Sequence, residues 1–165
     1  MFDSSKWLLF STFLFVLFVS KTYVETNSQI PDLRIRKTGS DWPSFLGPSG
    51  DGKSPENFSI DPWGISGPSL VWQTKTGESY GAPAISRGRL FIFDRHQNLA
   101  RLSCMRSEKK ELLWQFEYPT DYKDIYGYNN GPRSCPVVDN DRVYIYGPKG
   151  ILHCLNVLDG ALRWK

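Results

Sequence analysis

An internal repeat limits the fold of this chain more than any other feature of its sequence. Pro83-Ala84-Ile85 matches Pro136-Val137-Val138 at an offset of 53, and Arg89–Phe93 matches Arg142–Tyr146 at the same offset. Three residues are then lost from a turn, and four further matches follow at an offset of 50: Leu102, Cys104, Leu112 and Trp114 with Leu152, Cys154, Leu162 and Trp164. Matches in one conserved order indicate two copies of one structural unit.

Each copy contains four short runs with the residue types of β-strands. In the first copy they are Ala82–Ser86, Arg89–Asp94, Leu99–Met105 and Leu112–Phe116, separated by turn residues such as Gly88 and Asn98. Runs such as Leu90-Phe91-Ile92-Phe93 are apolar on both alternating faces, so each sheet needs cover on both sides. The pattern predicts an all-β fold, a β-propeller of four-stranded antiparallel blades. Trp72 marks the end of an earlier partial unit, so we expect about two blades and part of a third, an incomplete ring.

The stretch Cys154–Trp164, with Asp159-Gly160 before the tryptophan, resembles the tryptophan-docking repeat of pyrroloquinoline-quinone-like (PQQ-like), or quinoprotein-type, propellers. The segments Asp41–Gly52 and Gly131–Val138 are similar to those of exported bacterial proteins with such repeats. The resemblance covers residues 41–165 and implies that a tryptophan packs on a glycine of the neighbouring blade. The docking residues would be Trp72, Trp114, Gly160 and Trp164. The first copy has Lys109-Lys110 in place of Asp-Gly, which would weaken its docking contact.

Residues 1–24 carry an apolar run, Trp7–Val19, that is short for a membrane span but suits a secretory signal. We expect a signal peptide or an uncleaved signal anchor; a buried core helix is a less favoured alternative. Residues 25–40 are polar and lack periodicity, which predicts a flexible linker. The protein would therefore be exported, periplasmic or membrane-anchored, with the propeller outside the cytoplasm.

Charge and motifs exclude several functions. Lys and Arg number 20 against 17 Asp and Glu, without a basic face, so nucleic acid is not an expected partner. Gly47–Ser54 matches the phosphate-binding P-loop pattern, but it lacks the strand and helix that such a loop needs. His96 and His153 fit no metal-ligand spacing, and no metal site is expected. Cys104 and Cys154 occupy equivalent places in blades about 10 Å apart, too far for a disulfide.

An insertion at Tyr118–Arg133 lengthens the link between the two copies by 11 residues relative to the link after Trp72. Propeller loops at one rim commonly carry binding surfaces, and the candidate residues here are Tyr126, Tyr128, Asn130 and Arg133. The alternative, which we favour, is that the tyrosines cover the rims of neighbouring blades.

The sequence thus predicts a non-catalytic binding or assembly scaffold at the cell envelope, with a protein partner there. The resemblance also implies an alternative, a fragment of a PQQ-dependent dehydrogenase whose active site lies in other blades. The dehydrogenases of this type hold the quinone under a disulfide of adjacent cysteines and use acidic residues for calcium. No adjacent cysteines occur in this chain. We therefore assign no catalytic and no cofactor-binding residue, and PQQ would bind only in the complete protein.

Overall fold

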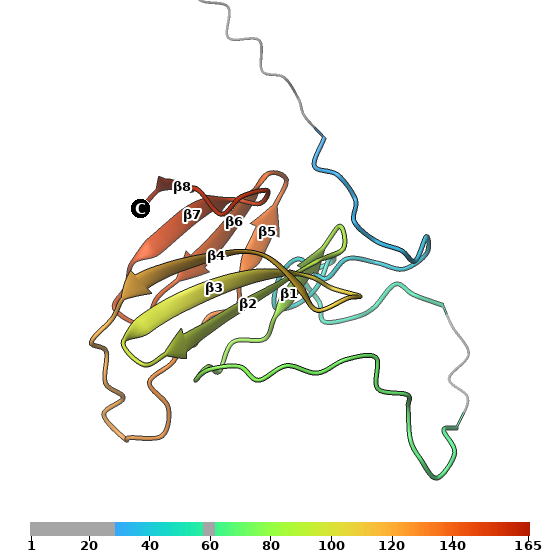
Figure 1. The fold of residues 1–165 in the computed structure, drawn as a ribbon, viewed down its shortest axis with the longest axis horizontal. Helices are drawn as coiled ribbons and strands as arrows, with labels where there is room; N and C mark the ends of the chain where they lie inside the picture. The colour runs from blue at the N-terminus through green and yellow to red at the C-terminus, as the bar shows by residue number, and fades with distance from the viewer. Residues whose placement is uncertain (1–28, 58–61) are drawn as a thin grey trace, which may run out of the picture.

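The computed structural model describes residues 29–57 and 62–165; the signal or anchor predicted for residues 1–24 lies outside the described residues. Eight strands form two four-stranded antiparallel sheets (Figure 1). The strands are β1 (Ala84–Ser86), β2 (Arg89–His96), β3 (Leu99–Arg106), β4 (Glu111–Pro119), β5 (Val137–Asp139), β6 (Arg142–Tyr146), β7 (Leu152–Asn156) and β8 (Leu162–Trp164). The described ranges contain no helix and hence none that could span a membrane. The predicted all-β class and the four-stranded antiparallel units are confirmed.

The two sheets share one internal register. In the first sheet (β1–β4), Ala84 pairs with Phe91, Phe91 with Cys104 and Cys104 with Trp114. The second sheet (β5–β8) repeats this row with Val137, Tyr144, Cys154 and Trp164. A β-bulge follows Cys104 in one sheet and Cys154 in the other. The residues that match between the two copies of the sequence therefore occupy the same paired positions across the strands of the two sheets.

The core lies between the sheets. It includes Phe91, Phe93, Leu102, Cys104 and Trp114 from the first sheet, and Val138, Val143, Ile145, Leu155 and Val157 from the second sheet and the turn that follows β7. Each large apolar side chain buried in this way stabilises the fold by about 1.5–3 kcal/mol. The first sheet is therefore covered on the face that carries the Phe91–Trp114 row.

The opposite faces of the two sheets differ. On the far side of the first sheet, the Gly77 amide donates to the buried Asp94 carboxylate, which also pairs with Arg101. On the far side of the second sheet, large apolar side chains are exposed: Val137, Tyr146, Leu152 and Trp164. The second sheet thus presents an open apolar face with the same residue row that the first sheet buries.

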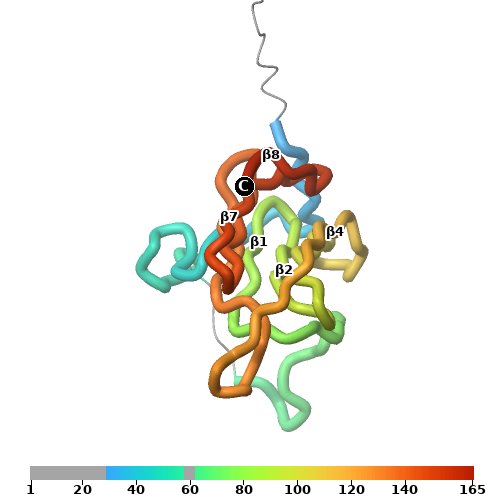
Figure 2. The backbone as a smooth tube through the Cα atoms, turned by 90° about the vertical axis from the view of Figure 1, so that its left-hand side faces the viewer, coloured from blue at the N-terminus to red at the C-terminus, as the bar shows by residue number. Residues whose placement is uncertain are grey.

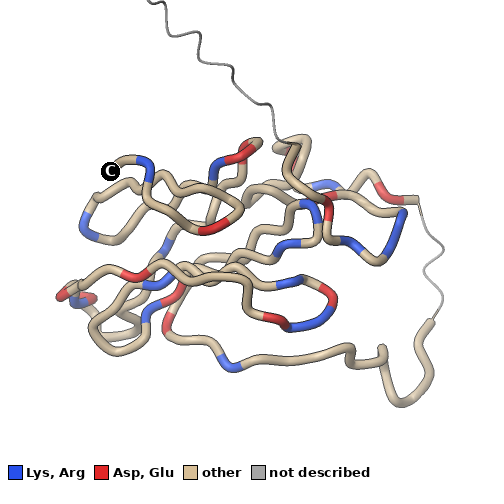
Figure 3. Tube along the Cα trace, turned by 45° about the horizontal axis from the view of Figure 1, so that its top comes forward, with Lys and Arg blue, Asp and Glu red and all other residues tan. Residues whose placement is uncertain are grey.

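The cysteines are all free, and Cys104 and Cys154 are completely buried. Burial raises the pKa of Cys104 to about 12, because the interior disfavours its thiolate. The thiol therefore behaves as a small apolar side chain at its place in the row. Figure 3 shows Lys and Arg residues interspersed with Asp and Glu along the trace.

Part of the segment predicted as a linker lies against the first sheet. The amide of Leu33 donates to the carbonyl of Arg87 over 3.0 Å. The amides of Ile35 and Arg36 donate to the carboxylate of Glu108, in the turn between β3 and β4. Residues 33–36 are therefore held at the end of the sheet where β1 turns into β2.

Candidate binding surface

Trp114 joins the two sheets. Its indole Nε1 donates to the carbonyl of Val157 over 2.9 Å, and its ring lies on Gly160 in the turn between β7 and β8. Gly160 has φ of +71°, and a Cβ at this position would lie 2.5 Å from Cε3 of Trp114. Only glycine meets both demands, the left-handed backbone and the close approach of the ring. The structure brings these two predicted docking residues together.

Trp72 makes the corresponding contact one repeat earlier. Its Nε1 donates to the carbonyl of Ser107 over 2.9 Å, and Ser107 is equivalent to Val157 at the offset of 50. Lys110, equivalent to Gly160, holds φ of +55°. The turn thus keeps its left-handed backbone although its side chain is not glycine. Trp72 remains half-buried, whereas Trp114 is only 8% exposed.

Trp164 holds the same place in the second sheet but is 46% exposed. Its ring lies 6.0 Å from that of Tyr144 at an interplanar angle of 53°, and the equivalent pair Phe91–Trp114 has 6.0 Å and 56°. The second sheet therefore has its docking tryptophan in the orientation that the first sheet uses.

The loop between β4 and β5 is fixed at its base by Arg95. This buried guanidinium donates to the carbonyls of Tyr122 and Asn130, one from each arm of the loop. It also donates to the carbonyl of Gln97 and to the side-chain oxygen of Asn98. Four acceptors on one rigid cation hold the two arms together above the β2–β3 turn. The sequence offered no sign of this role, because the acceptors are mostly backbone carbonyls.

Asp124 fixes the tip of the same loop. Its carboxylate accepts from the amides of Tyr128 and Asn129 and pairs with Arg133 over 2.9 Å. Burial acts to raise the pKa of this carboxyl, but the amide donors and the Arg133 charge outweigh it and lower the pKa. The charged form is thus the one that organises the loop.

The four candidate residues of the loop divide into two pairs. Asn130 accepts from the Asp124 amide through its side-chain oxygen, and Arg133 lies over the Tyr80 ring at 4.9 Å, so both support the loop. Tyr126 and Tyr128 are 73% and 80% exposed, with ring centroids 6.2 Å apart. Ile125, which sequence reasoning missed, is 86% exposed beside them. We call Ile125, Tyr126 and Tyr128 the rim patch.

Tyr118 behaves differently from the exposed tyrosines. It belongs to β4, so the insertion begins later than the sequence suggested. Its ring stacks on that of His153 at 4.5 Å, between the two sheets. Among the described residues, neither its buried hydroxyl nor the buried Nδ1 of His153 has a hydrogen-bond partner. The favoured interpretation was that the tyrosines of the insertion cover a neighbouring sheet. Tyr118 does so, whereas Tyr126 and Tyr128 are exposed.

The metal-ligating and phosphate-binding motifs of the sequence can be compared with the described residues. Within residues 29–57 and 62–165, no group of three or more His, Cys, Asp or Glu side chains is arranged to hold a metal ion. The segment Gly47–Ser54 forms turns, and the described residues on either side of it, 41–46 and 55–57, form neither a strand nor a helix.

Comparisons with known proteins gave structural matches but no family match. No family model matches the chain, and no curated protein matches it significantly. Among solved structures, it is similar to a europium-containing methanol dehydrogenase, with a TM-score of 0.39 and 17% identity. The match covers 50% of this chain and 14% of that one, so the chain spans a small part of the length of that enzyme.

Proposed function

We propose that the two sheets are consecutive blades of an exported quinoprotein-like β-propeller that acts as a non-catalytic binding scaffold at the cell envelope. Support for the ring comes from Trp72 and Trp114, which reach equivalent carbonyls in successive repeats. By the same rule, Trp164 would dock on a further repeat, and the open apolar face of the second sheet would be buried by it.

The observation that carries the binding role is the rim patch on a preorganised loop. Exposed, contiguous apolar and aromatic side chains are typical of protein interaction sites. Arg95 and Asp124 fix the loop before any partner arrives, so little conformational entropy is lost on binding. Tyrosine adds a hydroxyl to each large ring, which suits a surface that must remain soluble when free. A protein partner is the class of ligand that fits this chemistry.

The test is site-specific photocrosslinking in cells that produce the full-length protein. A photoreactive phenylalanine analogue replaces Tyr126, and the control places it at Leu158, which is also exposed but lies in the turn between β7 and β8. We expect a discrete protein adduct from position 126 and none from position 158. Equal labelling at both positions, or none at 126, would reject the binding role.

A second assay, on the purified full-length protein, distinguishes the scaffold hypothesis from the dehydrogenase hypothesis. After incubation with PQQ and a calcium or lanthanide salt, an alcohol substrate and an artificial electron acceptor are added. A scaffold should retain no quinone absorbance after gel filtration and should not reduce the acceptor. Retained quinone together with turnover would replace our proposal with the enzymatic one.

A further inference from the structure

Residues 41–43 contact the first strand of both sheets. Trp42 and Ile85 exchange both backbone hydrogen bonds, Trp42 N to Ile85 O at 2.9 Å and Ile85 N to Trp42 O at 2.8 Å. The next carbonyl, that of Pro43, accepts from the amide of Val138 over 2.8 Å. Ile85 in β1 and Val138 in β5 are equivalent residues at the offset of 53. Two consecutive carbonyls of this segment thus accept hydrogen bonds from equivalent amides of the two sheets.

These amides lie on edge strands. The strand orders are β1-β2-β3-β4 and β5-β6-β7-β8, so β1 and β5 each have one side without a neighbour inside the sheet. An uncovered edge presents unpaired amides and carbonyls that can pair with another chain. The segment fills this position on both sheets.

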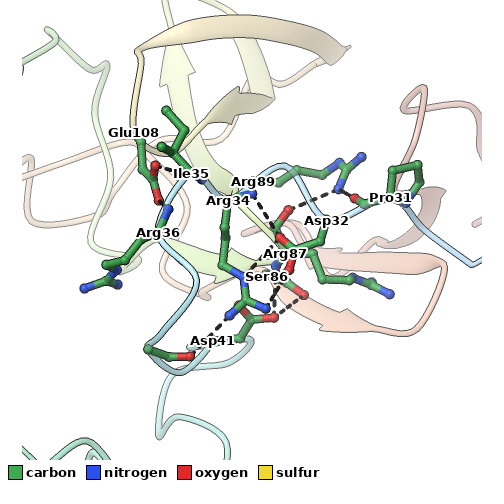
Figure 4. Close-up of polar contacts among 11 residues, drawn as sticks. Pro31, Asp32, Arg34, Ile35, Arg36, Asp41, Ser86, Arg87, Arg89 and Glu108 are labelled. Atoms are coloured by element: carbon green, nitrogen blue, oxygen red, sulfur yellow. Dashed lines mark hydrogen bonds and ion pairs between the residues drawn. The ribbon is translucent and has the colours of Figure 1, made fainter.

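The entry of the segment is anchored to the first sheet (Figure 4). One carboxylate oxygen of Asp41 accepts from the Ser86 hydroxyl at 3.1 Å and from the Arg87 amide at 2.9 Å. Further upstream, the buried Arg89 guanidinium donates to the carbonyl of Pro31 over 2.7 Å. These bonds hold the chain at the β1–β2 turn before it reaches the edge.

The exit of the segment is a turn closed on the Trp42 ring. The amide of Gly47 donates to the carbonyl of Ser44, and Trp42 Nε1 donates to the carbonyl of Phe45. A Cβ at Gly47 would lie 2.8 Å from the Trp42 ring. Figure 2 shows the cyan loop that follows on the β7 side of β1, opposite β4. The chain therefore turns away from the sheets after its contacts with the edges of β1 and β5.

We propose that residues 41–43 are an inner collar that caps the edges of β1 and β5 in cis, ties the two sheets together and blocks pairing with a second copy of the chain. The proposal needs neither a closed ring nor a partner at the rim patch. It predicts that the two edges open together, because one segment covers both.

The test uses two glycines that share a left-handed backbone. Gly47 and Gly50 have φ of +75° and +70°, but a Cβ at Gly50 would meet no atom of the described residues within 4 Å. Alanine therefore strains the backbone equally at both positions, and only Gly47→Ala displaces the Trp42 ring. Overpacking of this kind should speed amide exchange at Ile85 and Val138 by about tenfold or more. Hydrogen exchange of the full-length protein by NMR measures both amides.

We expect faster exchange at both amides in Gly47→Ala, with the amides of β3 and β7 unchanged, and wild-type rates in Gly50→Ala. Asp41→Ala provides a second route if Gly47→Ala does not fold, since it removes the anchor without a clash. Light scattering should then show concentration-dependent association of the opened variant. Unchanged rates, a change at Ile85 alone, or an opened variant that stays monomeric would each overturn the proposal.

Discussion

Replacing Gly160 by alanine should destabilise the protein far more than the same change at Gly127. Both glycines have φ of +71°, so an alanine in the left-handed region adds the same backbone strain of about 1–2 kcal/mol at each. In the part of the chain that the structure describes, a Cβ at Gly127 would meet no atom within 4 Å, whereas one at Gly160 would lie 2.5 Å from Cε3 of Trp114. Carbon atoms prefer a separation of about 3.5–4.0 Å, so the indole must move by about 1 Å.

The indole has little room for such a shift. It is buried between the sheets and bonded to the Val157 carbonyl. Overpacking adds about 1–3 kcal/mol, and loss of the hydrogen bond adds about 0.5–1.5 kcal/mol. We therefore expect Gly160→Ala to lower the free energy of unfolding by about 2–4 kcal/mol more than Gly127→Ala. Urea unfolding of the full-length protein, followed by fluorescence, measures the difference.

A double-mutant cycle separates the ring contact from other causes. In a Trp114→Ala background no ring lies on Gly160, so Gly160→Ala should cost about as much as Gly127→Ala. Equal costs for the two glycines in the wild-type background would refute the docking contact. A large cost that persists after Trp114→Ala would assign the strain to the turn itself.

Three further predictions follow from single side chains. Lys110→Gly should raise the free energy of unfolding by about 0.5–1 kcal/mol in the same urea experiment, because it removes the backbone strain of a non-glycine residue at φ of +55°. Burial, and next the charge of Lys165, lower the pKa of His153 below its ordinary 6.5. Its neutral form thus contributes stability that is fully present above pH 6.5 and lost as the pH falls, so the urea midpoint should drop toward pH 5 more in wild type than in His153→Phe. Arg95→Met should leave the sheets folded but make the β4–β5 loop more sensitive to limited proteolysis, because its two arms lose their shared donor.

The repeat predicted the strands well for a physical reason. Apolar residues must recur wherever two sheets face each other, so the matched rows that end in Trp114 and Trp164 are visible in the sequence as well as in the structure. The glycine beneath the indole is equally visible, because no other residue fits there. Both signals come from packing of side chains.

Backbone contacts explain what the sequence did not reveal. Arg95 acts through carbonyls 27 and 35 residues away, and any residue type supplies a carbonyl. The collar likewise pairs through the backbone of Trp42 and Pro43, without an alternating pattern. The rim patch was found only in part, because composition does not show which tyrosines a loop buries and which it exposes. Tyr118 and Tyr128 belong to the same predicted insertion, but Tyr118 is partly buried and Tyr128 is exposed.

Exchange of the indole proton of Trp164 in the full-length protein tests the central claim most directly. If a further repeat docks on the second sheet, this proton should be protected like that of Trp114, which is bonded and buried. Trp63, at 70% exposed, provides the unprotected reference in the same NMR spectrum. Our account predicts that Trp164 exchanges slowly, together with Trp114. Exchange as fast as that of Trp63 would contradict it, since the open face would then have no neighbouring blade.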